Sequence, residues 1–347
     1  MKTFRCACGA RVFFENTRCT ACGRELGFAV ELSALTAIEP APDGGYLATL
    51  DGHVCRKCSN YVEQGVCNWL VPAEDGHSLC QACRLNRVVP DLSQPESRQL
   101  WAAMETAKRR LLYTLNQLKL PALPVSESPH GLTFDIKADT PGQRVLTGHA
   151  DGVITLNVAE ADPVLREQVR VEMEERYRTP LGHLRHESGH YYWELLIGGT
   201  PRLERFRALF GDERTDYGAA LRAHYSRPQR DWQSAYISHY ASAHPMEDWA
   251  ETWAHYLHLV DTLETAAHFG FVPDGEAPVP VEPVDMGALM DTWSELTIAL
   301  NSLNRSMGMP DPYPFQAPPP VVDKLDFVHG VLIEAAGGGG ERESGAA

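Results

Sequence analysis

The chain has 347 residues, of which 44% are hydrophobic and 22% charged, so it has the composition of a folded globular protein with room for two or three domains. Its formal net charge of −15 argues against nucleic acid as the main partner, because binding phosphates requires a concentrated Lys/Arg surface. No segment approaches the roughly 18 apolar residues of a membrane span, and the first residues lack the apolar stretch of a secretion signal, which predicts a cytoplasmic protein with no membrane partner.

All nine cysteines lie between Cys6 and Cys83. In a chain without a predicted secretion signal, such clustering indicates metal binding rather than disulfides. The first four form two thiol pairs on either side of an apolar segment, residues 11–14, that suits a hairpin strand: Cys6, Cys8, Cys19 and Cys22. Four thiolates in this layout predict a zinc ribbon, in which the metal replaces a core that so short a segment cannot build.

The second cluster holds five cysteines, although a tetrahedral site takes four. Spacing alone would pair Cys55-x-x-Cys58 with Cys80-x-x-Cys83. The rival set is Cys58, Cys67, Cys80 and Cys83. Between the two clusters, Asp43-Gly44-Gly45 and Asp51-Gly52 are turn signals that predict a connecting region.

The remaining chain predicts helices interrupted by a few strands. Ser93 and Glu96 fit a capping box that opens a helix to about Leu120. Alternating apolar residues predict strands at 132–136, 144–148 and 152–158, with an Asp151-Gly152 hairpin turn between the last two. Helical periodicity and helix start and stop signals predict further helices at 162–178, 179–197, 202–210, 216–225, 231–240, 245–269, 286–307 and 323–335. A flexible tail is expected over 337–347.

A metal-binding pattern lies in the predicted helix 179–197. His186 and His190 are four residues apart, so their imidazoles share one helical face and can reach a single tetrahedral Zn²⁺. Glu187 is rotated about 100° around the helix, beside the position that a metal-bound water would take. This is the H-E-x-x-H arrangement of zinc peptidases. His183 is a competing ligand, but the placement of the glutamate favours His186 and His190.

A third ligand is expected in the predicted helix 245–269, because a catalytic zinc needs three protein ligands and an open position. Glu247 and Glu251 share one face of this helix, opposite Trp249, Trp253 and Leu257. Two carboxylates aimed alike repel each other unless a cation or a histidine lies between them. A zinc bound by one, with the other accepting the N–H of a ligating imidazole, removes that repulsion.

These segments resemble known families. H-E-x-x-H followed by a helix with Glu-x-x-x-Glu resembles the gluzincins. The runs L-G-H-L-R-H-E-S-G-H-Y-Y-W, F-G-D-E-R-T-D-Y-G-A-A-L and P-x-E-D-W-A-E-T-W-A-H-Y-L-H resemble closely a bacterial family of zinc-binding metallopeptidases with an N-terminal zinc ribbon, over Cys6 to about Phe271. A more distant likeness is to anthrax lethal factor, in which a catalytic tyrosine lies seven residues before the ligand glutamate, where this chain has Tyr240.

The resemblance implies a role for each of these residues. A catalytic zinc would be bound by His186, His190 and Glu247. Glu187 would be the general base and Tyr240 would stabilise the oxyanion. Glu251 would contact a ligand side chain without binding the metal. C-x-N-Y-x₅-C-N-W and C-x-A-C-R-L match the family at Cys58, Cys67, Cys80 and Cys83, which implies these four as the ligands of a second structural zinc and leaves Cys55 over. The resemblance thus implies one catalytic and two structural zinc ions.

Together these inferences predict an α+β protein. Residues 1–90 would form a double zinc-ribbon region, 91–125 a linker helix, 126–336 a mainly helical, zincin-like metallopeptidase domain with a small antiparallel sheet, and 337–347 the tail. The strand near 153–158 is expected, by analogy alone, to be an edge strand that pairs with an extended substrate. Five other histidines are expected to pack or cap: His224, His239, His244, His255 and His258. Asp212, Glu213, Arg214 and Asp216 either position the site or form a surface cluster.

The predicted function is hydrolysis of a peptide or protein by a zinc-activated water, with the zinc ribbons recognising a protein partner or gating the site. Two alternatives remain at this point. One is a non-enzymatic zinc-ribbon adaptor with a structural H-E-x-x-H zinc, which would need neither Glu187 nor Tyr240. The other is an SprT-like protease acting on DNA-bound proteins. The net negative charge of the chain disfavours this alternative.

Overall fold

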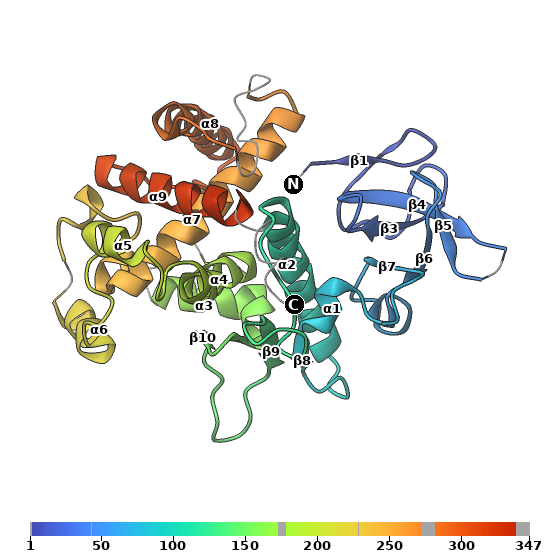
Figure 1. Cartoon of the computed structure of the whole chain (residues 1–347), viewed down its shortest axis with the longest axis horizontal. Helices are drawn as coiled ribbons and strands as arrows, with labels where there is room; N and C mark the ends of the chain where they lie inside the picture. Colours follow the sequence, from blue (N-terminus) through green and yellow to red (C-terminus); the bar gives the residue numbers. More distant parts are fainter. Residues whose placement is uncertain (1, 43, 173–177, 228, 273–281, 338–347) are drawn as a thin grey trace, which may run out of the picture. The chain divides into compact units, whose positions relative to one another are not determined.

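The computed structural model describes residues 2–42, 44–172, 178–227, 229–272 and 282–337. Contacts divide these residues into two compact units (Figure 1). The first contains residues 2–117, 121–172 and 179–181, and the second contains residues 118–120, 178 and 182–337. All nine cysteines therefore lie in the first unit, whereas His186, His190 and Glu247 lie in the second.

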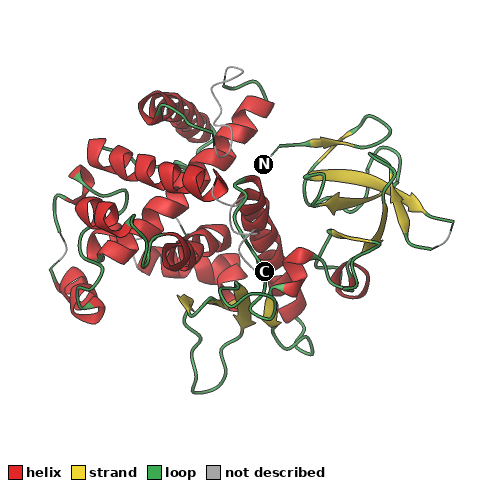
Figure 2. Cartoon of the chain, in the orientation of Figure 1, coloured by secondary structure: helices red, strands yellow, loops and turns green. Residues whose placement is uncertain are grey.

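The first unit begins with two small antiparallel sheets (Figure 2). Strands β1 (Phe4–Arg5) and β2 (Arg11–Val12) form the first cysteine-bearing hairpin. A five-stranded meander follows, made of β3 (Glu25–Ala29), β4 (Ala34–Pro40), β5 (Tyr46–Ala48), β6 (Val54–Lys57) and β7 (Leu70–Pro72). The prediction of a connecting region was wrong here. Gly44, Gly45 and Gly52 have φ of 91°, 78° and 78° and reverse the chain between strands, so these turn signals belong to a sheet.

Helix α2 (Ser97–Gln117) is the main helix of the first unit. It follows the π-helical turn η1 (Asn60–Gln64), helix α1 (Gln81–Arg84) and strand β8 (Asn86–Val88). The expected apolar stripe is buried, since Met104, Leu111 and Leu115 have no exposed surface. The predicted capping box was wrong, however. The Ser93 backbone N–H bonds the side chain of Asp91 at 2.9 Å, and the helix starts four residues later.

A four-stranded sheet with the order β10-β11-β9-β8 completes the first unit, with helix α3 (Pro163–Glu172). Its strands β9 (Thr133–Lys137) and β11 (Val153–Asn157) agree with prediction, whereas β10 (Gly148–Ala150) shares only Gly148 with the strand predicted at 144–148. The hairpin turn is confirmed, with φ of 50° at Asp151 and 75° at Gly152. The edge-strand prediction was wrong, because β11 lies between antiparallel β10 and parallel β9. The prediction of an antiparallel sheet was therefore wrong: the sheet is mixed, and β10 and β8 form its two edges.

The second unit is helical. Its helices are α4 (Pro180–Leu196), α5 (Leu203–Phe210), α6 (Tyr217–Ser226), α7 (Pro245–His268), α8 (Met286–Ser306) and α9 (Pro319–Gly337). The helix predicted at 231–240 was wrong. Two short 3-10 turns, η3 (Trp232–Ser234) and η4 (Tyr240–Ala243), take its place. Serine hydroxyls compete for the backbone here, since Ser234 donates to Asp231 O and Ser238 accepts the Ala241 N–H.

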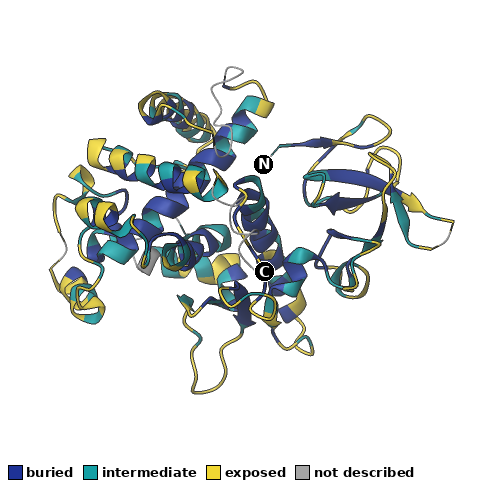
Figure 3. Cartoon of the chain, in the orientation of Figure 1, coloured by how far each residue is buried: buried dark blue, intermediate teal, exposed yellow. Residues whose placement is uncertain are grey.

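Helix α7 is the central helix of the second unit, and 15 of its 24 residues are buried. Figure 3 shows much of this helix in the colour of buried residues. Trp249 and Trp253 are fully buried against α4. Their indole N–H groups donate to Gly189 O at 2.8 Å and to Ser188 Oγ at 3.1 Å. A Cβ added at Gly189 would lie 3.0 Å from Ala250 Cα. The glycine inside the histidine motif thus permits the close approach of the two helices that carry the candidate ligands.

The α+β class is confirmed, with a cysteine-rich, sheet-containing N-terminal region followed by a mainly helical part. Among the described residues, no helix combines the length and apolarity that crossing a membrane requires. The tail predicted over 337–347 lies outside the described residues beyond Gly337.

Candidate metal centre

Helices α4 and α7 bring three metal-ligand side chains together. His186 and His190 lie on one face of α4, with ring centroids 5.1 Å apart. From α7, Glu247 places Oε2 3.0 Å from His186 Nε2 and Oε1 3.7 Å from His190 Nε2. One ligand atom from each residue lies within 4.8 Å of the others. In a tetrahedral site with bonds of about 2.0–2.1 Å, ligand atoms lie about 3.3 Å apart, so this cluster has zinc-site dimensions.

The hydrogen bonding of His186 fixes which nitrogen faces the cluster. His186 Nδ1 lies 2.6 Å from Glu251 Oε1, and because a carboxylate only accepts, Nδ1 carries the proton. In the neutral imidazole, the Nε2 lone pair then faces the Glu247 carboxylate. Glu247 is 1% exposed, and its Oε2 has no hydrogen-bond donor. Two lone pairs facing each other in a buried site require a cation between them, so the donor set fits zinc.

Without a metal, a proton fills the same electrostatic role. Burial opposes the charged form of His186, but the carboxylates of Glu247 and Glu251 outweigh burial and raise the pKa of the imidazole well above its usual range. Burial likewise opposes ionisation of Glu247, yet His186 and His190 hold the pKa of that carboxyl well below its usual value. The cluster is therefore organised around one positive charge.

Glu251 supports His186 instead of joining the cluster. Its Oε1 accepts the Nδ1–H of His186, and its Oε2 accepts the hydroxyl of Ser238 at 2.6 Å. Both carboxylate oxygens are thus occupied, which fixes the orientation and tautomer of the imidazole. Ser238 has no recognisable motif in the sequence, and its role is visible only in the folded chain.

Glu187 and Tyr240 are the predicted general base and oxyanion donor; Glu187 follows His186 on α4, and Tyr240 packs near His186. Glu187 is buried on the neighbouring face of α4, with 9% exposure. Tyr240 opens η4, and its ring centroid lies 5.9 Å from that of His186. Burial, the charge of Glu247 and the neighbouring Tyr217 all raise the pKa of Tyr240. Its hydroxyl therefore keeps its proton and can act as a donor.

Tyr217 is a site residue that the sequence analysis missed. It is the first residue of α6, and its hydroxyl donates to Glu247 Oε1 at 2.7 Å. Burial and the nearby carboxylates of Glu247 and Glu187 raise the pKa of Tyr217. The signal was available, because Tyr217 stands in the F-G-D-E-R-T-D-Y-G-A-A-L run, but only the charged residues of that run were singled out.

Those charged residues build the loop before α6. Asp212 pairs with Arg214 at 2.8 Å, Glu213 pairs with Arg207 at 2.5 Å, and Asp216 caps α6 by accepting the Ala219 N–H at 2.7 Å. They therefore position Tyr217 without joining the cluster.

The predicted packing and capping histidines include a link between this loop and α7. His244 caps α7 by accepting the Met246 N–H at 3.1 Å, and its Nε2–H donates to Thr215 O at 3.0 Å. Among the other four, His224 and His255 are buried. His239 packs its ring against that of His224, with centroids 4.3 Å apart, and His258 contacts Arg185.

The cysteines of the first unit form two further clusters. One contains Cys6, Cys8, Cys19 and Cys22, and the other contains Cys58, Cys67, Cys80 and Cys83. Sulfur pairs lie 3.6 Å (Cys6–Cys22), 3.8 Å (Cys8–Cys19) and 3.7 Å (Cys67–Cys80) apart. Zn–S bonds of about 2.3 Å imply a spacing of about 3.8 Å in a tetrahedron, so both sets have the dimensions of zinc ribbons.

Cys55 lies apart from both clusters. It belongs to β6 and packs in a core with Ala48, Ile38 and Leu70. Burial raises the pKa of its thiol to about 11, and neither four-cysteine cluster among the described residues includes it.

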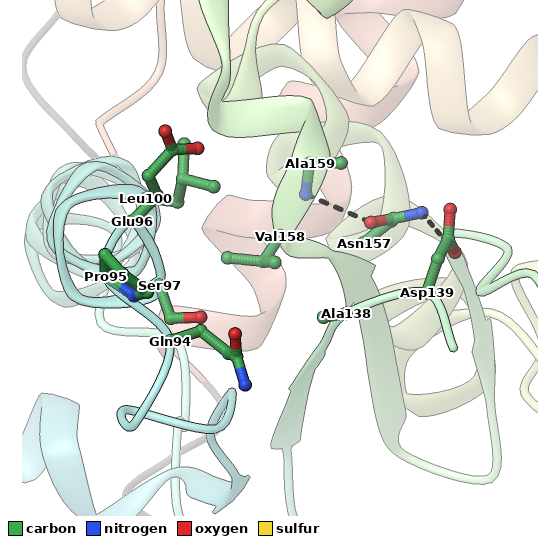
Figure 4. Close-up of a pocket in the computed structure, with 10 residues that line it drawn as sticks. All are labelled: Gln94, Pro95, Glu96, Ser97, Leu100, Ala138, Asp139, Asn157, Val158 and Ala159. Atoms are coloured by element: carbon green, nitrogen blue, oxygen red, sulfur yellow. Dashed lines mark hydrogen bonds between the residues drawn. The ribbon is translucent and has the colours of Figure 1, made fainter. Parts of the chain in front are cut away.

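The first unit also contains a cavity of about 380 Å³ between the start of α2 and the ends of β9 and β11 (Figure 4). Its polar groups bond one another, since Asn157 donates to Asp139 at 2.9 Å and accepts the Ala159 N–H at 3.0 Å. Its ten lining residues include no histidine or cysteine. This cavity therefore contains none of the three candidate metal clusters.

Comparison with known proteins agrees with this picture. Residues 97–331 match the family described as "Putative zinc-binding metallo-peptidase", and residues 3–94 match a zinc-ribbon domain. The chain is 43% identical over 343 residues to uncharacterized proteins of Mycobacterium tuberculosis and Mycobacterium bovis, and the match covers 97% of this chain and 96% of each relative. No solved structure matches the chain.

Proposed function

Since this chain belongs to the zinc-binding metallo-peptidase family that its residues 97–331 match, we propose that it is a zinc-dependent peptidase that hydrolyses peptide bonds. The observation that carries this proposal is the convergence of His186, His190 and Glu247, with Glu251 fixing the imidazole of His186. Within the part of the chain that the structure describes, this cluster contains three side chains. A tetrahedral site would then keep one position for water, as catalytic zinc sites do.

In this proposal, His186, His190 and Glu247 hold the metal. Zinc bound there supplies an acidic water and polarises the scissile carbonyl. Glu187 is the general base that accepts the proton of the attacking water and passes it to the leaving amine. Tyr240 donates a hydrogen bond to the developing oxyanion, for which its retained proton suits it.

Supporting residues hold this geometry. Glu251 orients His186, and Tyr217 orients the carboxylate of Glu247. The imidazoles of His186 and His190 keep 14% and 17% of their side-chain surface exposed, so a substrate has access to the face on which the water would lie.

The two cysteine clusters complete the proposed zinc complement of one catalytic and two structural ions. The structural ions would be held by Cys6, Cys8, Cys19 and Cys22 and by Cys58, Cys67, Cys80 and Cys83. We assign the ribbons to recognition of a protein partner or substrate.

The test uses Glu187→Gln in the full-length protein. Metal analysis should find three zinc ions per chain in both the parent and the variant, because Glu187 is not a ligand. A mixture of fluorogenic peptides should be cleaved by the parent, and the rate should fall at least 10²-fold in the variant. Equal cleavage by both proteins would refute the assigned base. An intact zinc complement with no cleavage by the parent would favour the adaptor, and salt-dependent DNA binding would favour the DNA-associated protease.

A further inference from the structure

A second cavity, of about 230 Å³, lies within the second unit between α7, α8 and residues 312–315. Aromatic and imidazole rings form most of its wall. They belong to His255, His258, Trp293, Tyr313 and Phe315. None of these residues takes part in the metal centre.

The aromatic wall is held rigidly. Trp293 packs edge-on against Tyr313 with centroids 4.8 Å apart, and Phe315 packs against His255 at 4.6 Å. The side-chain amide of Asn301 donates to Tyr313 O at 2.8 Å and accepts the Tyr313 N–H at 3.2 Å. The Tyr313 hydroxyl lies 2.8 Å from His255 Nδ1. Because these contacts fix both the backbone and the side chain of Tyr313, the cavity is preformed, as ligand pockets usually are.

The lining is uncharged. Its nine residues, all described by the structure, include no Lys, Arg, Asp or Glu. Arg185 contacts Nδ1 of His258, and since a guanidinium only donates, that nitrogen must carry a lone pair and His258 is neutral. Asp261 pairs with the charge of Arg185. The cavity thus offers no counter-charge to an ionic ligand, and burying an unpaired ion there would be costly.

Its polar groups are also largely occupied. The Thr297 hydroxyl donates within its own helix, to Trp293 O at 2.9 Å and to Ser294 O at 3.0 Å. The ligand that suits this surface is therefore an uncharged ring that packs against aromatic faces. A cavity of 150 Å³ accommodates benzene, so 230 Å³ has room for a phenol or an indole.

The cavity lies along the same helix as the proposed metal ligand. His255 follows Glu251 by four residues and Glu247 by eight on α7, which corresponds to about 6 Å and about 12 Å of helix. An extended peptide advances about 3.3 Å per residue. A side chain in the cavity would therefore belong to a residue about two to four positions from the bond at the metal centre.

We propose that this cavity binds the aromatic side chain of a Phe, Tyr or Trp residue in the peptide substrate and so sets the sequence preference of the enzyme. The role in substrate selection rests on the proposed peptidase function. The binding of an aromatic ring does not depend on hydrolysis and can be measured separately.

The first experiment measures binding of N-acetyl-tryptophanamide to the zinc-loaded Glu187→Gln protein by calorimetry or ligand-observed NMR. Thr297→Phe should fill the cavity and weaken binding at least tenfold. Among the described residues, the Thr297 hydroxyl donates within its own helix, to Trp293 O and Ser294 O, so the substitution breaks no hydrogen bond to another element. Ser294→Phe, on an exposed position of α8, is the matched control and should change binding less than twofold. If Thr297→Phe does not fold, Thr262→Phe fills the same cavity from α7.

The absence of saturable binding, or equal binding by the filled and control variants, would overturn the proposal. A second measurement compares kcat/KM for peptides that differ only by Phe or Ala at each position, using the chain with Glu187 intact. We expect one position at which Phe is favoured at least tenfold and at which Thr297→Phe abolishes the preference. Cleavage without any aromatic preference would contradict the pocket assignment. If Thr297→Phe weakens ring binding and Ser294→Phe does not, while no peptide is cleaved, the proposed peptidase function would instead be refuted.

Discussion

The Tyr217 hydroxyl donates a 2.7 Å hydrogen bond to Glu247 Oε1, across the 30 residues that separate them in the chain. Tyr217→Phe removes this donor and leaves the ring in place. Because partners of metal ligands fix ligand orientation, we expect zinc affinity at the centre to fall about 10–100-fold, measured by competition with a chelator. Tyr225→Phe, on the same helix at 62% exposure, should leave affinity unchanged. Equal affinities for both variants would show that the bond does not support the metal.

Glu247 and Glu251 should respond differently to the same amide substitution. Glu247→Gln should lose the zinc of this centre, because an uncharged amide replaces a ligand carboxylate. Glu251→Gln should keep the ion with about 10–100-fold lower affinity, since it only loses a strong acceptor for the Nδ1–H of His186. Zinc content after graded dialysis against a chelator distinguishes the two. Loss of the metal in Glu251→Gln together with retention in Glu247→Gln would reverse the ligand assignment.

Substitutions of Cys55 and Cys67 should distinguish a cysteine that packs in the core from one that binds zinc. Cys67→Ser should reduce the zinc content by one ion per chain, because all four thiolates of its cluster are needed. Cys55→Ala should keep the full zinc content and lower the unfolding free energy by about 1 kcal/mol through lost packing. Elemental analysis and denaturant titration measure the two effects. A lower zinc content in Cys55→Ala would restore the alternative ligand set.

Asp248 of α7 and Lys324 of α9 form a buried ion pair, 2.6 Å apart and 1% and 5% exposed. Burial raises the pKa of Asp248 to about 7, against the opposing effect of Lys324. Lys324→Met should destabilise the protein by about 3–5 kcal/mol, because it leaves an acid without its cation. Adding Asp248→Asn should recover most of this loss, and Lys119→Met, at an exposed position, should cost little. Denaturant titration of the four proteins would contradict this if the double variant were no more stable than the single one.

His255 should make stability depend on pH. Burial lowers its pKa to about 4, although Glu251 acts in the opposite direction. The unfolded chain, with an ordinary pKa of about 6.5, binds the proton first, so the contribution of His255 is present above about pH 6.5 and is lost as pH falls towards 4. The parent should lose about 2–3 kcal/mol more than His255→Gln between pH 7 and pH 4.5. The comparison cancels effects that both proteins share, including release of zinc. Parallel pH profiles would show that His255 is not buried as a neutral ring.

Local patterns predicted the parts of this molecule that depend on nearby residues. The helix with His186 and His190 was predicted within one or two residues of α4, because Gly198-Gly199 ends it, and α7 begins at the predicted Pro245. Glu247 was predicted as the third ligand, and in the structure its carboxylate lies within 4.8 Å of ligand atoms of His186 and His190.

Features that depend on contacts between elements were not predicted. The order of β10, β11 and β9 required the tertiary fold, and so did the hydrogen bond from Ser238 to Glu251. Tyr217 has an ordinary helix-start environment in the sequence, and only the folded chain shows its hydroxyl on Glu247. Hydrogen bonds between distant side chains leave no periodic signal in a single sequence.

Gly189 has no side chain of its own, and a methyl group there would lie 3.0 Å from Ala250 Cα. Three residues before Ala250 comes Glu247, and one residue after Gly189 comes His190. The distances between the proposed ligands therefore depend on the close packing of α4 against α7, which the absence of a side chain at Gly189 permits. Substitution of Gly189 would therefore change metal selectivity without altering any ligand, because each added side-chain atom would increase the distance between α4 and α7.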